Sequence, residues 1–325
     1  MRYDPRFDPD EPNEPELIIS SDDVEHTPPR IGRLLILLGL LFGGFLLVHN
    51  VVPLYTDWLW FGEVGYRNVF TTTIATKTLL FFSGALLFFA VFYLNVRHAR
   101  RLAPEDTDRF LRQQFGAQWG QTIQNGIGWI LLGVGAFLSL WAGRIAAESW
   151  QNWLQFRYWT PFRITDPVFG NDVGFYIFRL PFLDFLWQFG FYTLVLTTAA
   201  VLFLHWVGRA IDSLSGLPSA AAGVRGHVLA LLAALTAMGA LGFSLSRYDL
   251  LLNENGVFTG AGYADLRYRL FAIYAQTVLL ALTALACLAA IWQGRSFRWP
   301  TIGVGAWLTA LILLGNVVPA LMQKI

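Results

Sequence analysis

Seven long apolar runs constrain this chain more than any other feature, because each is about as long as a helix that crosses a lipid bilayer. A spanning helix needs about 20 mostly apolar residues, at a rise of about 1.5 Å each, to cross about 30 Å of hydrocarbon. The candidate spans are residues 31–52, 73–96, 127–146, 183–207, 228–246, 270–292 and 302–322. We therefore expect an all-α integral membrane protein, built as a bundle of seven transmembrane helices.

A large soluble helical protein is the main alternative. Its buried helices would normally keep a polar face with a period of about 3.6 residues, and segments such as 34–48 and 279–291 have none. Only 14% of the residues are charged, against about 25% in an average soluble protein. No basic stripe suggests a nucleic-acid partner. The single cysteine, Cys287, lies within the sixth run and cannot form an intrachain disulfide.

The first 30 residues form a separate region. They contain nine of the 22 acidic residues and six of the 14 prolines, so they offer too little apolar surface to offset the entropy of ordering. We expect a disordered tail over residues 1–30 and a membrane domain over residues 31–325. The first span lacks the order of features of a secretory signal, and it is expected to remain as an uncleaved anchor.

Lys and Arg residues near the span ends predict the orientation. If the tail is cytoplasmic, the loop after the second span places a cluster of arginines on the inner side: Arg97, Arg100, Arg101, Arg109 and Arg112. Most outer arginines have an acidic residue within a few positions. We expect a cytoplasmic N-terminus and, after seven crossings, an extracytoplasmic C-terminus.

Two connecting segments are predicted to form interfacial amphipathic helices. The outer segment between the third and fourth spans has Trp150, Trp153 and Leu154 at helical spacing, which suits rings lying at headgroup level. An aromatic ligand box is the alternative for this segment. On the inner side, residues 104–119 combine a helix start with apolar side chains every four residues, and Arg109 and Arg112 are available to anionic lipid.

Two outer loops contain related strings, Phe61–Tyr66 and Phe169–Phe175. Each combines an acidic residue with flanking glycines and aromatic residues, a pattern typical of tight turns. Two similar turns at the membrane surface explain this better than a duplicated hairpin, which is the alternative.

The spans are nearly free of charged groups, which disfavours an ion-coupled carrier. Lys77 lies near one span end, Arg144 is one turn from Glu148, and Asp184 is placed in the first turn of the fourth helix, where the helix dipole favours an anion. The main polar groups of the later spans are expected to form interhelical hydrogen bonds; they are Gln276, Thr277 and Asn316. The prolines are expected at span ends, at Pro53, Pro181 and Pro319.

No motif for hydrolysis, metal binding or nucleotide binding is present, so we predict no catalytic, cofactor-binding or metal-binding residues. The histidines are scattered over the tail and the span ends, at His26, His49, His98, His205 and His227. Six outer acids could meet around a cation, and these are Asp57, Glu63, Asp166, Asp172, Asp249 and Asp265. Local pairing is the simpler expectation, of Asp265 with Arg269 and of Asp249 with Arg247.

Small residues recur every four positions in three of the spans. These ridges let helix backbones approach closely and predict helix packing, within the chain or against a partner. They are Gly39 with Gly43; Gly135 with Ser139 and Gly143; and Thr236 with Ala240 and Ser244.

The outer loop strings, from Asp57–Tyr66 through Asp166–Phe178 to Arg247–Leu252 and Gly262–Asp265, resemble a large bacterial membrane-protein family. It is known only as an uncharacterised protein family, number zero-one-eight-two in the UPF series. The resemblance runs from about Arg33 to the end of the chain. It implies a block of seven spans in the bacterial plasma membrane followed by a large extracytoplasmic domain, with no established activity. This chain departs from that pattern by stopping at Ile325.

Bare spans, packing ridges and elaborate outer loops favour a non-enzymatic anchor or scaffold for an extracytoplasmic domain or partner complex. Membrane lipids and other membrane or extracytoplasmic subunits are the expected partners, and no cofactor is expected. The first alternative is a transporter or lipid-handling protein, whose activity would depend on Gln276 or Asn316. The second is a membrane enzyme that uses the outer carboxylates, which would require them to converge in one cleft.

Overall fold

The computed structural model describes residues 30–102, 117–207, 220–252, 260–263, 265–294 and 296–314. These residues are nearly all helical, and apart from one isolated bridge they contain no β-structure. The helices, with two π-helical segments labelled η, are α1 (Arg30–Glu63), α2 (Arg67–Arg101), α4 (Ala117–Glu148), α5 (Trp150–Arg157), η2 (Phe175–Arg179), α6 (Leu180–Val207), α7 (Ala222–Ser246), α8 (Asp249–Leu252), η4 (Asp265–Arg269), α9 (Leu270–Trp292) and α10 (Arg298–Ile312).

Six helical stretches of the described chain are long and apolar enough to cross a membrane. They are Leu34–Glu63, Arg67–Arg101, Gly128–Glu148, Phe175–Val207, Ala222–Leu252 and Asp265–Trp292. Each contains most or all of one predicted span, and α9 has the predicted bounds of 270–292. The seventh predicted span begins within α10 and continues beyond residue 314, outside the described residues. The all-helical, membrane-like character predicted from the sequence is confirmed.

The chain divides into two compact units, residues 1–70 and 71–325. In the first, α1 runs without interruption through Pro53 to Glu63. The prediction that Pro53 lies at a helix end is therefore wrong: the apolar run stops there, but the helix continues through the aromatic residues that follow. A turn at Val64 and Gly65 ends it, and Gly65 has a φ of 77°, a conformation that glycine adopts easily. The Gly39 and Gly43 ridge has no described neighbour within 4 Å.

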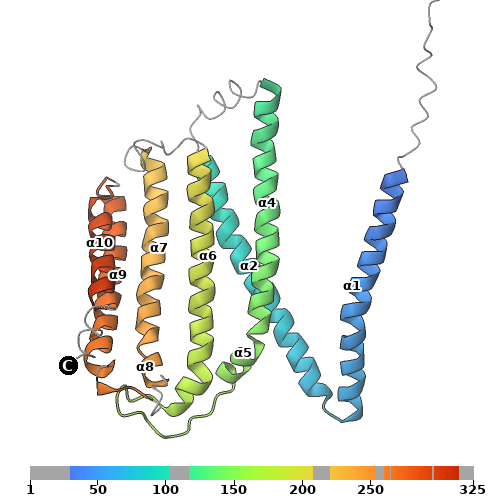
Figure 1. The fold of residues 1–325 in the computed structure, drawn as a ribbon, viewed down its shortest axis with the longest axis horizontal. Coiled ribbons are helices and arrows are strands. Elements are labelled where there is room, and N and C mark those ends of the chain that lie inside the picture. Colours follow the sequence, from blue (N-terminus) through green and yellow to red (C-terminus); the bar gives the residue numbers. More distant parts are fainter. Residues whose placement is uncertain are drawn as a thin grey trace, which may run out of the picture. The chain divides into compact units, whose positions relative to one another are not determined.

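In the second unit, α6 packs on α7, α7 on α9, and α9 on α10, and Figure 1 shows these helices running side by side. A buried cluster of Phe88, Phe92, Val96 and Ala142 joins α2 to α4, with α6 residues packed against it. At Gly143 the helices approach so closely that an added Cβ would lie 2.6 Å from the Phe81 carbonyl oxygen. This contact confirms packing at the ridge predicted in the third span.

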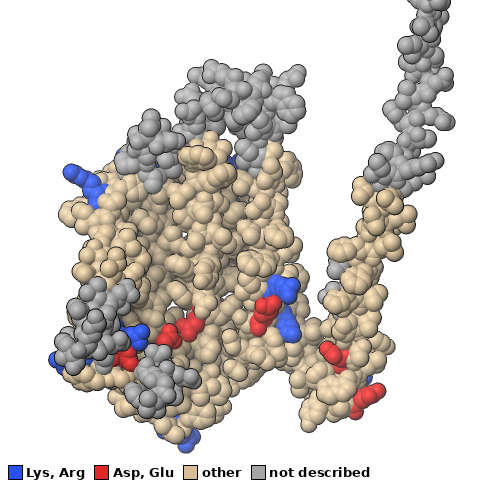
Figure 2. All heavy atoms as spheres, viewed as in Figure 1, with Lys and Arg blue, Asp and Glu red and all other residues tan. Residues whose placement is uncertain are grey.

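The connections α5, α8 and η4 lie at one end of the second unit (Figure 1). Figure 2 shows most of the visible charged side chains near this end and a broad uncharged surface over the helices. Most charged side chains on the visible described surface thus lie near these connections. The predicted tail, and all but the last residues of the predicted inner helix at 104–119, lie outside the described residues.

Candidate functional site

Asp166 organises the loop between α5 and η2. Its carboxylate accepts hydrogen bonds from the backbone amides of Val168 (2.9 Å), Phe169 (2.6 Å) and Asn171 (2.8 Å), and from the Tyr176 hydroxyl (2.8 Å). Partial burial would raise the pKa of Asp166, but the Phe169 amide, the Tyr176 hydroxyl and the other amides outweigh it and hold the pKa below its ordinary value. The carboxylate thus serves as an ionised clamp for its own loop.

Asp172 closes the same loop from the other side. It accepts hydrogen bonds from the amides of Phe162 (3.0 Å), Arg163 (2.7 Å) and Gly174 (2.7 Å). Desolvation alone would raise the pKa of Asp172, but these amides lower it below its ordinary value. A short antiparallel bridge joins Thr165 to Asp172. Arg163 has a φ of 60°, an uncommon conformation for a residue with a side chain, and the Asp172 carboxylate holds its amide in place.

A cluster of aromatic rings joins this loop to the end of α7. The Tyr248 ring lies 5.3 Å from Phe169, 5.1 Å from Phe175 and 5.8 Å from Tyr176, measured between centroids. Arg247 lies over the Tyr248 ring and donates a 2.6 Å hydrogen bond to its hydroxyl. Within the described residues Arg247 forms no ion pair with Asp249, so this predicted pairing is wrong: the phenol is the partner that the guanidinium contacts.

The predicted outer helix is present as α5. Trp153 and Phe156 pack against Phe182 of α6, with ring centroids 5.2 and 5.1 Å apart. The ammonium group of Lys77 lies 5.2 Å from the centroid of the Trp150 ring, which suits a cation–π contact. Trp150 and Trp153 therefore contact the bundle, while the interfacial position of α5 stays a prediction.

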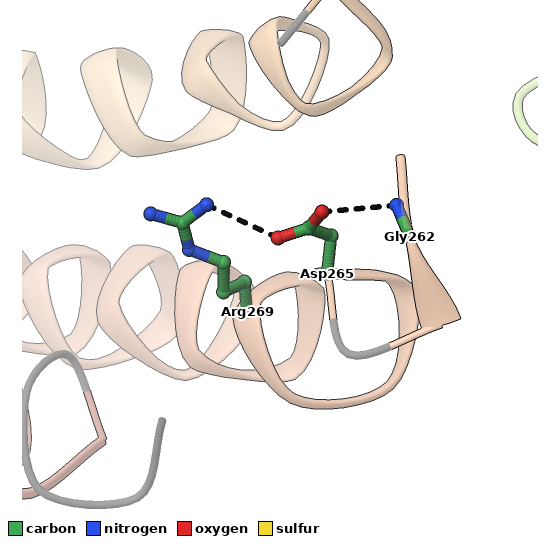
Figure 3. Close-up of polar contacts among 3 residues, drawn as sticks. All are labelled: Gly262, Asp265 and Arg269. Atoms are coloured by element: carbon green, nitrogen blue, oxygen red, sulfur yellow. Dashed lines mark hydrogen bonds and ion pairs between the residues drawn. The ribbon is translucent and has the colours of Figure 1, made fainter. Parts of the chain in front are cut away.

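Two local ion pairs are confirmed at this end of the second unit. Arg144 contacts Glu148 at 3.2 Å. Arg269 of η4 contacts Asp265 at 3.1 Å, and Asp265 also accepts a 2.9 Å hydrogen bond from the amide of Gly262 (Figure 3). The second pair ties the start of α9 to the loop that precedes it.

A cavity of about 290 Å³ lies between α7, α9 and α10 and has Gln276 among its lining residues. Gln276 is 2% exposed, and among the described residues neither the nitrogen nor the oxygen of its amide group has a hydrogen-bond partner. The expected interhelical bond is thus wrong for Gln276. It is also wrong for Thr277, whose hydroxyl bonds to the Ile273 carbonyl of its own helix at 2.9 Å. Asn316 lies outside the described residues.

Three histidines come together at the opposite end of the second unit. The His227 ring lies 4.7 Å from His98 and 5.7 Å from His205, between centroids. Asn95 donates to the Val91 carbonyl at 2.7 Å, which leaves its side-chain oxygen to accept from His227 Nε2 at 3.1 Å. His227 Nδ1 and His205 Nε2 have no hydrogen-bond partner in the described part of the chain. A cavity of about 520 Å³ lies beside His98 and His227.

This histidine cluster was not predicted from the sequence. The residues are far apart in the chain, but each lies at the inner end of a predicted span, and that shared position was the available signal. In the described part of the chain, no group of three or more His, Cys, Asp or Glu side chains is arranged to hold a metal ion.

The outer acids do not form one carboxylate cluster in the second unit. Asp166 and Asp172 bind backbone amides, and Asp265 pairs with Arg269. Asp184 was expected in the first turn of its helix, and this is wrong: helical structure already starts at Phe175, about two and a half turns earlier. Asp57 and Glu63 belong to the first unit.

The two related strings fold differently. Gly62 lies within α1 and Gly65 has a positive φ, whereas in the second string the positive φ is at Gly170. The positions with unusual backbone conformation thus do not correspond. The structure favours two separate turns over a duplicated hairpin.

The family model described as Uncharacterised protein family (UPF0182) matches residues 34–325. A UPF0182 protein of Streptomyces coelicolor is 33% identical over 300 residues, which cover 91% of this chain and 30% of the relative. A UPF0182 protein of Corynebacterium efficiens is 35% identical over 277 residues, 84% of this chain and 28% of the relative. The chain thus spans about three tenths of the length of these relatives. No solved structure matches it.

Proposed function

The chain belongs to the UPF0182 family of uncharacterised proteins, and we propose that it is the non-enzymatic membrane anchor of a larger assembly in the bacterial plasma membrane. In this proposal the helices hold a preformed surface on the extracytoplasmic side, and a further domain or a partner subunit binds that surface. The N-terminus lies in the cytoplasm, as the arginines of the inner loops suggest.

The loop between α5 and η2 is the main support for this proposal. Its two carboxylates together accept hydrogen bonds from six backbone amides, and the Tyr248 cluster attaches it to α7. Charge-assisted bonds of this kind are about twice as strong as neutral ones. The carboxylates are therefore committed to shaping the loop, which disfavours a role for them as catalytic acids or bases.

The same loop exposes apolar side chains. Tyr158 is 72% exposed, Phe162 48% and Ile164 64%. Exposed apolar groups on a preformed loop are typical of a surface that binds lipid or protein. We name Tyr158, Phe162 and Ile164 the outer apolar patch, and propose that it binds the extracytoplasmic part of the assembly.

A split-protein experiment tests the anchor role. This chain would be expressed in a bacterium together with the part of the Streptomyces coelicolor relative that lies outside the matching region. We expect that part to sediment with membranes only when this chain is present, and an Ile164→Asp or Phe162→Asp variant to release it. The matched control is Leu308→Asn on α10, an exposed apolar position away from the loop.

Equal sedimentation with and without this chain would contradict the anchor role. A purified chain that converts a substrate without any partner would contradict its non-enzymatic character. A transport or lipid-handling role is the second candidate, and the unpartnered amide of Gln276 in its cavity is the observation that favours it.

A further inference from the structure

Gln276 is a buried amide with nothing in the described chain to bind. Leaving such a group unpaired costs about 1–3 kcal/mol, so the site is more stable when something fills it. Because both the amide nitrogen and the amide oxygen lack partners, Gln276 can donate one hydrogen bond or more and also accept.

Two charged side chains share this cavity with Gln276. Asp249 lines the cavity and forms no ion pair within the described residues, so its carboxylate is available to a cation. Arg269 uses one terminal nitrogen, Nη1, for Asp265 (Figure 3), and a guanidinium has five N–H groups in all. The cavity therefore offers a carboxylate to a cation and a guanidinium to an anion.

The size and walls of the cavity suit the polar end of an amphiphile. Gln276 lies seven residues after Arg269 on the same helical stretch, which places it about 10 Å further along the helix. Six lining residues are apolar, from Phe243 on α7 to Leu314 after α10. A volume of about 290 Å³ is at the small end of the range of about 300–1,000 Å³ for ligand pockets. It holds a headgroup and its nearest chain atoms rather than two whole acyl chains.

We propose that this cavity binds the headgroup of a zwitterionic aminophospholipid. In this proposal the ammonium group lies beside Asp249 and the phosphate beside Arg269. The Gln276 side chain turns into the cavity, and its amide nitrogen donates hydrogen bonds to the oxygens of the glycerol region. Arg269 reaches the phosphate while it keeps its ion pair with Asp265. This lipid site is independent of the anchor role, because it is formed by α7 to α10 and does not use the outer apolar patch.

Binding of defined lipids to the purified full chain tests the site. Native mass spectrometry and lipid titration in detergent would compare phosphatidylethanolamine, which has an ammonium with N–H groups, with phosphatidylcholine, which has none, and with phosphatidylglycerol, which has no cation. We expect phosphatidylethanolamine to bind about tenfold more tightly than phosphatidylglycerol, with phosphatidylcholine between them. Asp249→Asn should remove that preference.

Gln276→Met keeps the length of the side chain and removes both polar atoms. It should weaken phosphatidylethanolamine binding about tenfold, while Thr277→Val, on the next residue, should leave binding unchanged. Melting curves without lipid would show that Gln276→Met is folded. Unchanged affinity in Gln276→Met, tighter binding of phosphatidylglycerol, or a cavity that holds only water in a density map would each overturn the proposal.

Discussion

The loop between α5 and η2 and the cavity at Gln276 treat their polar atoms in opposite ways. In the loop, Asp166 and Asp172 are only partly buried or exposed, yet together they take six amide hydrogen bonds. At the cavity, Gln276 is almost fully buried, and its amide forms no hydrogen bond with the described residues. Polar groups whose hydrogen bonds are formed within the chain stabilise its fold. A buried polar group without such bonds instead indicates a position where a ligand or a partner supplies them.

Removing Asp166 should produce the largest effect. Asp166→Ala leaves three amides and the Tyr176 hydroxyl without their acceptor, and we expect a loss of about 2–3 kcal/mol in the stability of the loop. Hydrogen exchange of the amides of Val168, Phe169 and Asn171 would measure it. Asp166→Asn keeps an acceptor oxygen and should lose less. Unchanged protection in the alanine variant would mean that the loop is held by its aromatic cluster instead.

Removing the polar atoms of Gln276 should stabilise the protein, whereas removing Asp166 should destabilise its loop. In lipid-free detergent, Gln276→Met should raise the stability of the chain by about 1–2 kcal/mol, because an unpaired amide is replaced by an apolar side chain of similar length. Thermal unfolding followed by circular dichroism would measure this, with Thr277→Val as the matched control. If Gln276→Met instead destabilises the lipid-free chain, the amide has a partner there and the contrast with Asp166 fails.

The Asn95–His227 pair is an intermediate case. His227 Nε2 forms a hydrogen bond with Asn95, whereas His227 Nδ1 has no partner among the described residues. Asn95→Leu would remove the acceptor of His227 Nε2 and should cost about 1 kcal/mol. His227→Phe, made in the Asn95→Leu background, should restore part of the loss, because it removes the ring N–H group that Asn95→Leu leaves unpaired. Thermal unfolding of the two single variants and the double variant would measure this coupling, and additive effects would show that the bond contributes nothing.

A change of pH near neutrality should have the smallest effect on the stability of the loop between α5 and η2. The folded pKa values of Asp166 and Asp172 lie below the ordinary value of 3.8, so their stabilisation is complete well above that value and is lost as the pH falls through the lower folded pKa. Limited proteolysis of the loop should therefore be constant from about pH 5 to 8 and rise below about pH 3.5. Opening of the loop already at pH 5 would contradict this.

The sequence predicted the helices well because the bilayer requires long apolar segments, and α9 has the predicted bounds. It failed where the apolar run and the helix differ in length: α1 continues beyond Pro53, and helical structure begins well before Asp184. It could not show that the third span lies against Phe81 and Ala85 of the second rather than against a partner, because the ridge pattern is the same in both cases.

The candidate sites were predicted less completely. Gln276 stood out as a polar residue in an apolar span, but only the structure shows that no described neighbour forms a hydrogen bond with its amide. Asp166 and Asp172 were noted as acids, while their amide partners depend on loop geometry that sequence spacing does not specify. The histidines of α2, α6 and α7 meet because alternate crossings return the chain to the same end, and this relation becomes visible only once the spans are ordered in space.

The π-helical segments η2 and η4 each stand between a loop and the start of a long helix. A π-turn is equivalent to one residue inserted into an α-helix, and one residue corresponds to a rotation of about 100° around the helix axis. Deleting a single residue from η4 would therefore turn α9 by roughly that angle relative to the loop at Gly262, and would point Gln276 away from α7 and α10. The η2 and η4 segments thus set the rotation of α6 and α9 about their axes, and with it the face on which the few polar residues of these two helices lie.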